Sequence, residues 1–224
     1  MTFSIAARCE ITGMFGVAVT SSSPAVAARC AHARAGVGAV SSQNITDPRL
    51  GSAILTMMEN GASAIDAINY VTASEPHIEY RQLTAVDASG ASFIYSGEYT
   101  LGTHTSASAK NVACAGNLLA NTEVCSAMVS AFEKSDGHLG DRLIASMQAG
   151  LKAGGEAGPI HSAGMYMVDK LEFPVADIRC DWTENCPIEN IAKAWTIYKP
   201  QLEDYVKRAI DPREAPSYGV PGDE

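Results

Sequence analysis

The sequence predicts an α+β fold of four layers, in which two antiparallel sheets lie between two layers of helices. The strand patterns are joined by short turns, as in hairpins, whereas parallel strands need long crossover connections. Helical patterns occur in adjacent pairs that separate the groups of strands. Stacking two sheets face to face, with the helices outside, buries the apolar face of every element.

The period of the apolar residues gives the order of the elements. Alternation with a period of two indicates strands and their hairpin turns over residues 2–8, 10–19, 35–43, 80–97, 110–117, 161–168 and 173–182. The range 80–97 holds two strands joined at residues 88–90. Apolar residues spaced by three or four indicate helices over residues 47–61, 63–71, 122–132, 139–151 and 188–210. We expect the last helix to be interrupted at Pro200, which lacks a backbone donor.

Capping signals mark the starts of the first two helices. Asp47 stands before Pro48, a residue that suits the first position of a helix. Ser63 precedes Asp66 by three positions, the spacing of a capping box. Gly61 lies between the two patterns, so the second helix follows the first through a very short turn.

The length of the chain fits one domain. Its 224 residues are enough to bury a substantial core. We expect a single domain over residues 1–211 and an extended tail over residues 212–224, which is rich in Pro, Gly and acidic residues. A tail of this kind needs a surface to hold it, and we therefore expect a homodimer.

Composition and charge exclude several classes of protein. The net charge of −9 repels phosphate backbones, so we expect no nucleic-acid partner. No run reaches the ~18 apolar residues that a membrane span needs, and the first residues lack the pattern of a secretory signal. The expected location is the cytoplasm, with no membrane partner.

We expect neither a metal nor a cofactor. The six cysteines form no C-x-x-C pair, which favours free thiols, with a bridge between Cys180 and Cys186 as the alternative. The five histidines lack the spacing of a metal-binding helix. The chain has no Gly-Lys pair for a P-loop, and the run from Gly36 departs from the dinucleotide fingerprint at Ser41. No G-x-S-x-G motif of a serine hydrolase occurs.

The first residues suggest one kind of chemistry. Methionine is generally removed when a small residue follows, and removal of Met1 would expose the α-amine of Thr2 beside its own hydroxyl. An α-amine with a pKa of about 7.7–8.0 can take the proton from a hydroxyl nucleophile. The alternative is that Thr2 is an ordinary β-branched residue at the start of a strand.

Several stretches resemble a known family: MTFSIAAR, GVAVTSSSPAV, ARAGVGAVSSQ, RQLTAVDASG, AGNLLAN, and AGGE followed by HSAG. They span Met1 to about Val168. Together they are similar to the bacterial family numbered 1028 among the domains of unknown function, which is grouped with the N-terminal nucleophile (Ntn) hydrolase-like proteins. The resemblance implies an αββα fold and a Thr2 nucleophile that hydrolyses a small amide or peptide-like substrate.

Within this resemblance, candidate residues can be given roles. Arg34 is the candidate for a cation near the amine. Asn117, at a strand end, is the candidate oxyanion donor. Ser22, with its neighbours Ser21 and Ser23, would orient the amine or donate to substrate. Further candidates for substrate recognition are Gln43, Asn44, Arg81 and Ser162.

Each of these residues also has a purely structural interpretation. Arg34 can be a surface or salt-bridged arginine, Asn117 a turn residue, and the serines partners of turn backbone. The loop GGEAGPIHSAG also departs from the family pattern, in which arginines follow the acid: here Glu156 is followed by Ala157, Gly158, Pro159 and Ile160. A catalytically silent protein that binds a metabolite or a protein partner is therefore the alternative function.

Overall fold

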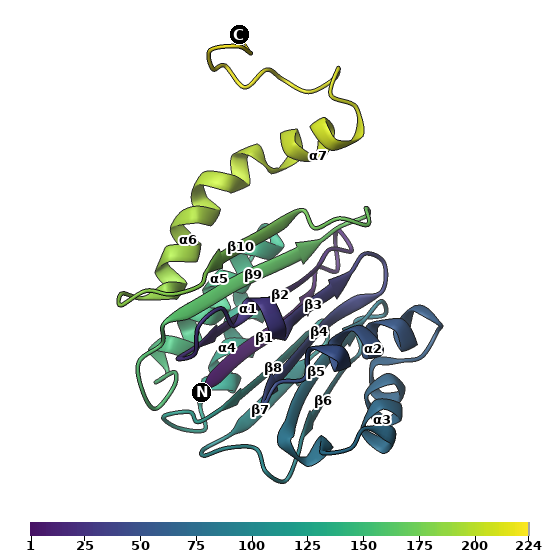
Figure 1. Ribbon diagram of the computed structural model, residues 1–224, viewed down its shortest axis with the longest axis vertical. Helices are drawn as coiled ribbons and strands as arrows, with labels where there is room; N and C mark the ends of the chain where they lie inside the picture. Colours follow the sequence, from purple (N-terminus) through teal and green to yellow (C-terminus); the bar gives the residue numbers. More distant parts are fainter. Residues whose placement is uncertain (224) are drawn as a thin grey trace.

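The computed structural model describes residues 1–223 and has two antiparallel sheets between layers of helices (Figure 1). This architecture confirms the four-layer α+β fold expected from the sequence. The two sheets pack directly on each other, with β1 and β2 of the larger sheet against β3, β4 and β5 of the smaller one.

The larger sheet has six strands in the order β10-β9-β2-β1-β8-β7. Their bounds are β1 (Thr2–Arg8), β2 (Phe15–Ser21), β7 (Thr105–Ala109), β8 (Val112–Asn117), β9 (Ser162–Val168) and β10 (Ala176–Cys180). The N-terminal strand β1 is thus central and is paired on both sides.

The smaller sheet has four strands in the order β3-β4-β5-β6. Their bounds are β3 (Ala31–Arg34), β4 (Gly38–Asn44), β5 (Arg81–Asp87) and β6 (Ser92–Ser96). Every pairing in both sheets is antiparallel.

Two pairs of helices cover the outer faces of the sheets. Helices α2 (Pro48–Glu59) and α3 (Ala64–Ser74) pack on the smaller sheet, and α4 (Val124–Lys134) and α5 (Leu139–Lys152) pack on the larger one. Helix α6 (Pro187–Tyr198) lies against β9 and β10. The remaining helical segments are α1 (Ala27–Cys30), α7 (Leu202–Ile210) and two 3-10 turns, η1 (Ile78–Tyr80) and η2 (Lys199–Gln201).

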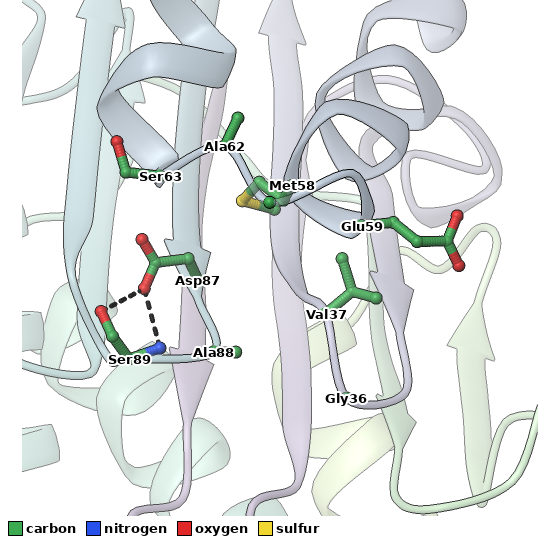
Figure 2. Close-up of a pocket in the computed structure, with 10 residues that line it drawn as sticks. Gly36, Val37, Met58, Glu59, Ala62, Ser63, Asp87, Ala88 and Ser89 are labelled. Atoms are coloured by element: carbon green, nitrogen blue, oxygen red, sulfur yellow. Dashed lines mark hydrogen bonds between the residues drawn. The ribbon is translucent and has the colours of Figure 1, made fainter.

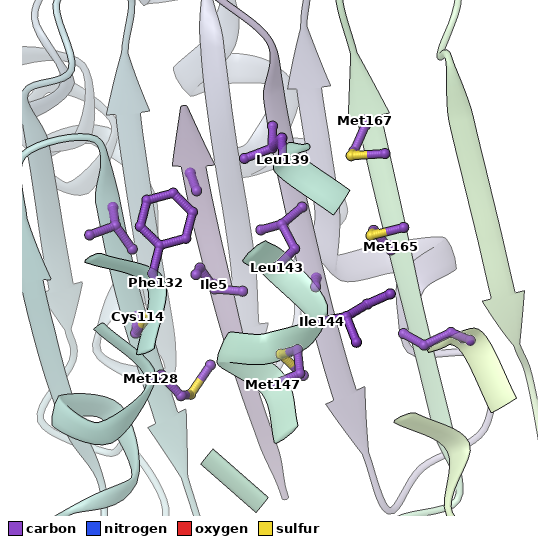
Figure 3. Packing of buried hydrophobic residues seen from close by; sticks show 14 of the residues in the cluster. Ile5, Cys114, Met128, Phe132, Leu139, Leu143, Ile144, Met147, Met165 and Met167 are labelled. Carbon is purple, nitrogen blue, oxygen red and sulfur yellow. The ribbon is translucent and has the colours of Figure 1, made fainter. Parts of the chain in front are cut away.

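The core follows from the alternation along β1. Phe3 and Ile5 point toward α4 and α5, where Figure 3 shows Ile5 beneath Phe132 and Leu143. Ala6, on the opposite face, packs between the two sheets with residues of β4 and β5. A separate apolar cluster lies beneath α2 and α3. Both faces of β1 are therefore buried, which fixes its register firmly.

The expected caps are present. The Asp47 carboxylate accepts a hydrogen bond from the Arg49 backbone N–H (3.0 Å), and the Ser63 hydroxyl accepts one from the Asp66 N–H (3.2 Å). The C-terminal helix is interrupted at Pro200, as expected, where η2 separates α6 from α7. In Figure 1, α7 and the residues that follow it extend away from the sheets.

Three further findings concern the cysteines, the lengths of the helices and the grouping of possible metal ligands. All six cysteines are free, so Cys180 and Cys186 do not form the alternative bridge. Within residues 1–223, no helix is both long and apolar enough to cross a bilayer. The same residues contain no group of three His, Cys, Asp or Glu side chains that could hold a metal ion.

Candidate active site

Four polar residues form a row across one end of the larger sheet. Thr2 on β1 is paired with Ser21 on β2 and with Asn117 on β8, and Ser21 is paired with Ser162 on β9. Directly opposed residues of antiparallel strands place their side chains on the same face. We call Asn117, Thr2, Ser21 and Ser162 the polar row.

The polar row faces the smaller sheet. Ser4, two positions along β1 on the same face as Thr2, donates a hydrogen bond to Oε1 of Gln43 on β4 (2.6 Å). All four residues of the row are buried, and Thr2 is 6 % exposed. The row thus lies where the ends of the two stacked sheets meet.

Two hydroxyls of the row converge on the carbonyl group of Met1. Thr2 Oγ1 donates to the Met1 carbonyl oxygen (2.5 Å), and Ser21 Oγ donates to the same oxygen (2.5 Å). The two hydroxyl oxygens lie 3.3 Å apart. In this form of the chain the Thr2 nitrogen is an amide, so it cannot act as a base.

Arg29 is the cation that is connected to this end of the sheet. Its guanidinium donates to Ser23 Oγ (2.6 Å), and Ser23 Oγ lies 2.9 Å from Ser21 Oγ. Arg29 also donates to the carbonyl oxygens of Pro24 and Ala25, which fixes the loop after β2. Arg29 was not among the predicted site residues, because no sequence motif distinguishes it from the other arginines.

Arg34 lies elsewhere. It is paired with Gly38 at the far end of the smaller sheet and forms a partly exposed salt bridge with Glu59 (2.5 Å). Gly38 and Gln43 are five positions apart on β4, a separation of about 16 Å along the strand. The structure therefore does not bring Arg34 to Thr2, because the β3–β4 hairpin places Arg34 at the opposite end of the strands.

Asn117 is oriented by a buried amide network between the sheets. Its Nδ2 donates to Gln82 Oε1 (3.2 Å), which also accepts from Gln43 Nε2 (2.8 Å). The second Nδ2 hydrogen and the side-chain oxygen of Asn117 are not used in this network, so an amide hydrogen is available beside Thr2. Gln82 was not identified from the sequence, since a lone glutamine in a strand carries no signal.

Gln43 is part of the same network and is fully buried. Its amide donates to Gln82 and to the Ala115 carbonyl oxygen (3.1 Å), and its oxygen accepts from Ser4 and from Ser41 (3.3 Å). Its hydrogen bonds are all made within the protein, so it supports the site rather than facing a substrate.

Asn44, Arg81 and Ser162 hold backbone segments in place. Asn44 donates to the Tyr80 carbonyl oxygen (2.6 Å) and accepts from the Leu101 N–H (3.2 Å). Arg81 donates to the carbonyl oxygen of Ile45. The Ser162 hydroxyl donates to the Ser23 carbonyl oxygen (2.6 Å) and accepts from the Val26 N–H (3.2 Å), which anchors the loop after β2.

Glu156 brings a buried carboxyl group to the same place. The Ser22 N–H donates to its Oε2 (3.1 Å), whereas its Oε1 is buried without a hydrogen-bond partner. The residue is 6 % exposed, and this burial raises the pKa of Glu156 to about 8, although the positive charge of the Met1 amine and the Ser22 N–H act in the opposite direction. An unpaired buried acid is uncommon and calls for a functional explanation.

The loops that hold Glu156 and Ser22 carry backbone strain. Leu118, directly after the polar row, and Ala25, in the loop after β2, have φ of 51° and 50°. Left-handed conformations are costly for residues with a side chain and gather at functional sites. Leu118 also accepts from the Ala157 N–H (2.9 Å), which ties the Glu156 loop to the end of β8.

A concave region lies at the other end of the sandwich. The pocket there has a volume of about 360 Å³. Figure 2 shows residues that line it, including Val37, Ser63, Asp87 and Ser89. Asp87 accepts from the N–H groups of Ala64 (2.9 Å) and Ser89 (2.9 Å), and the Ser89 hydroxyl donates to it (2.6 Å). Its hydrogen bonds hold a turn and a helix start, so the fold itself uses the Asp87 carboxylate.

A family model and a solved structure that are similar to this chain belong to the same family. The family model described as "Family of unknown function (DUF1028)" matches residues 2–191. The crystal structure of protein SPO2555 from Silicibacter pomeroyi, of the same family model, is similar at 28 % identity, with a TM-score of 0.82 over 88 % of this chain and 89 % of that one.

More distant matches are Anbu (ancestral beta-subunit) structures. The one from Yersinia bercovieri has 12 % identity and a TM-score of 0.41 over 91 % of this chain and 97 % of that chain. A Gly-1 mutant from Hyphomicrobium sp. strain MC1 has 12 % identity and a TM-score of 0.43 over 92 % and 100 %. None of the curated proteins matches the chain.

Proposed function

This chain belongs to the family of unknown function DUF1028, and we propose that it is an N-terminal nucleophile amidohydrolase whose nucleophile is Thr2. One observation carries the proposal: the hydroxyls of Thr2 and Ser21 converge on the carbonyl oxygen of the acyl group attached to the Thr2 nitrogen. A substrate carbonyl that takes the place of this group meets a nucleophile and a hydrogen-bond donor at once.

The active form would begin at Thr2, after cleavage of the bond between Met1 and Thr2. The freed amine accepts the proton of the Thr2 hydroxyl, and Oγ1 attacks the carbonyl carbon of the substrate amide. The amine then returns the proton to the leaving nitrogen as the C–N bond breaks. Water, deprotonated by the same amine, hydrolyses the resulting ester and releases the acid product.

The polar row supplies stabilisation of the oxyanion. Ser21 Oγ already donates to a carbonyl oxygen in this position, and the free Nδ2 hydrogen of Asn117 lies on the other side of Thr2. Donors fixed before the reaction stabilise developing charge without reorganisation. The hydrogen bond from Asn117 to Gln82 and that from Ser23 to Ser21 hold these donors in place.

Arg29 takes the part that the sequence analysis gave to Arg34. Its guanidinium reaches Ser21 through Ser23, so it is a positioning residue rather than a group that touches substrate.

The fold is compatible with this mechanism. A central first strand in the larger of two stacked sheets, with helices outside, is the arrangement that the resemblance to Ntn hydrolases implies. The substrate class in this proposal is a small amide or peptide-like molecule, and the reaction uses no metal or cofactor. We also place the protein in the cytoplasm.

We further propose a homodimer that involves the C-terminal residues. Helix α7 and residues 211–223 extend from the sheets and expose Ile210, Tyr218 and Val220. Light scattering coupled to size exclusion, before and after deletion of residues 215–224, tests this: we expect a dimer that dissociates on deletion, and an unchanged mass would contradict it.

The experiment that tests the amidohydrolase is a mass measurement. Protein purified from the cells that make it is weighed intact and then treated with an electrophile that acylates N-terminal threonines. We expect Met1 to be absent and a single adduct on Thr2, with none on Thr2→Ala. Retention of Met1, or no adduct on an exposed Thr2, would contradict the proposal and favour the silent, ligand-binding alternative.

A further inference from the structure

We infer that the acyl group of the substrate is an α-amino acid with a free amine, and that Glu156 binds this ammonium group while the backbone of Gly158 receives the side chain. This inference rests on the proposed function and narrows its substrate class to aminoacyl amides, including peptides with an unblocked N-terminus. It follows from what Met1 does in the structure.

Met1 is itself an aminoacyl group at the reacting position. Its carbonyl carbon is bonded to the Thr2 nitrogen, and its carbonyl oxygen accepts from Thr2 Oγ1 and Ser21 Oγ (both 2.5 Å). In the acyl-enzyme the same kind of group would be bonded to Oγ1 of the same residue. The surroundings of Met1 therefore indicate the surroundings of a substrate acyl group.

The amine of Met1 lies in the field of a carboxyl group with an unused acceptor. Glu156 has one oxygen bonded by Ser22 and the other, Oε1, buried and unpartnered. The positive charge of the Met1 amine lowers the pKa of that carboxyl against the larger effect of burial, but the amine does not bond Glu156 Oε1 in the structure. Residues 154–160 contain no lysine or arginine. An incoming ammonium would supply the partner that Glu156 lacks.

The side chain of Met1 lies against Gly158, a position where the backbone conformation does not require a glycine. Gly158 has no positive φ, so other residues could adopt its backbone conformation. A Cβ at Gly158 would lie 2.9 Å from Met1 Cε and 3.5 Å from Met1 Sδ, and it would meet nothing else within 4 Å. The glycine thus leaves space for the end of an unbranched side chain, and Gly158→Ala would make that end move while the added Cβ contacts no other side chain.

The covalent step is balanced without a further reactant. Thr2 Oγ1 forms an ester with the aminoacyl carbonyl carbon as the amide C–N bond breaks, and the Thr2 proton passes through the amine to the leaving nitrogen. Water then adds to the ester carbonyl carbon as the bond to Oγ1 breaks, and its proton returns through the amine to Oγ1, which yields a free amino acid and restores the Thr2 hydroxyl. Glu156 binds the ammonium throughout and exchanges no proton with the reacting atoms.

Binding without turnover provides the test. Thr2→Ala, with Met1 removed and checked by mass, is titrated by calorimetry with L-methioninamide, with its desamino analogue 4-(methylthio)butanamide, and with glycinamide. We expect L-methioninamide to bind at least about tenfold more tightly than the desamino analogue, since hydrogen bonds to charged groups are the stronger ones. In this background, Glu156→Gln should remove that preference, and Gly158→Ala should weaken L-methioninamide but not glycinamide.

Three results would overturn the inference: equal affinity for L-methioninamide and its desamino analogue, a preference that survives Glu156→Gln, or no binding of either. Hydrolysis of the corresponding p-nitroanilides by the chain with Thr2 intact separates the two proposals. Turnover without a preference for the free amine would support the amidohydrolase and contradict the inference about the substrate. Preferential binding without turnover or acylation would support the inference about the ligand and contradict the amidohydrolase. If Glu156 serves only the Thr2 amine, Glu156→Gln slows both p-nitroanilides by the same factor.

Discussion

The two ends of the sheet sandwich each hold a buried carboxyl group, Glu156 near Thr2 and Asp87 at the opposite end, and both residues are 6 % exposed. Burial raises the pKa of each. For Asp87 this effect is outweighed by hydrogen bonds from Ser89, Ala64 and Ala91, so its pKa is lowered. For Glu156 the hydrogen bonding from Ser22 and the charge of the Met1 amine are insufficient, and its pKa rises to about 8.

The difference separates an acid whose acceptors the fold uses from one that the fold leaves partly unpaired. Asp87 binds N–H groups that would otherwise be unsatisfied at a turn and a helix start, so its charge stabilises the fold. Glu156 has an oxygen that the fold does not use, and it lies where the strained loops meet the polar row. Equal burial therefore says little about role, whereas the number of satisfied acceptors says much.

The largest expected effect tests whether chemistry belongs to the Thr2 end alone. Thr2→Ala should lower kcat/KM for a hydrolysed amide by at least about 10³-fold, because it removes the nucleophile. Ser89→Ala, at the pocket of Figure 2, is the matched hydroxyl deletion and should leave kcat/KM unchanged. Steady-state kinetics of both variants measures this, and equal losses would end the distinction between the two ends.

The next effect concerns stability. Asp87→Asn should lower the free energy of unfolding by about 2–3 kcal/mol at pH 7, since charge-assisted hydrogen bonds to three N–H groups and a hydroxyl are weakened. Glu156→Gln should instead raise it at that pH, because the carboxyl is ionised in the unfolded chain and must take up a proton on folding, whereas a glutamine carries no such cost. Urea titration compares the variants. A loss for Glu156→Gln would show that Glu156 supports the fold.

The same pair should give opposite pH dependences of stability. The Glu156 pKa is raised in the folded state, so its contribution is fully present below pH 4.5 and is lost as the pH rises through about 8. The Asp87 pKa is lowered, so its contribution is present above pH 3.8 and is lost as the pH falls through the lower folded value. Unfolding of the wild type relative to Glu156→Gln and Asp87→Asn, measured from pH 3 to pH 9, tests both signs.

The smallest effects compare two arginines, one at each end. Arg29→Ala should reduce kcat/KM about 5–10-fold, because Ser23 and then Ser21 lose their orientation. Arg34→Ala should leave kcat/KM unchanged and cost at most about 1 kcal/mol of stability, as expected for a partly exposed salt bridge. A larger kinetic effect at Arg34 would restore the role that the sequence analysis gave it.

Much of the fold was predictable because its signals are local. The alternation in residues 2–8, the caps at Asp47 and Ser63, and the break at Pro200 each act within a few residues, and each appears in the structure. Strands β3 and β7 were not predicted. Their sequences, AHAR and TSASA, are short and made of small or polar residues, so only pairing with β4 and β8 makes them strands.

The candidate site was predictable only in part, for a geometric reason. Thr2, Ser21, Asn117 and Ser162 stand at strand ends, and the antiparallel order places those ends together. Arg34 was predicted to lie near the amine because the sequence does not reveal that the hairpin before Gly38 places it at the far end of the smaller sheet. Arg29 and Gln82 act through other side chains, and such indirect contacts leave no pattern in a sequence.

The carbonyl group of Met1 also has a practical consequence for anyone who produces this protein. Any residue joined to the Thr2 nitrogen places an acyl group where the hydroxyls of Thr2 and Ser21 meet. Under the proposed mechanism, an affinity tag or fusion partner on that side would occupy the site with its last residue, and such protein would show no hydrolysis. Tags belong at the opposite terminus, and the fraction of chains that begin with threonine sets the upper limit of titratable sites in any preparation.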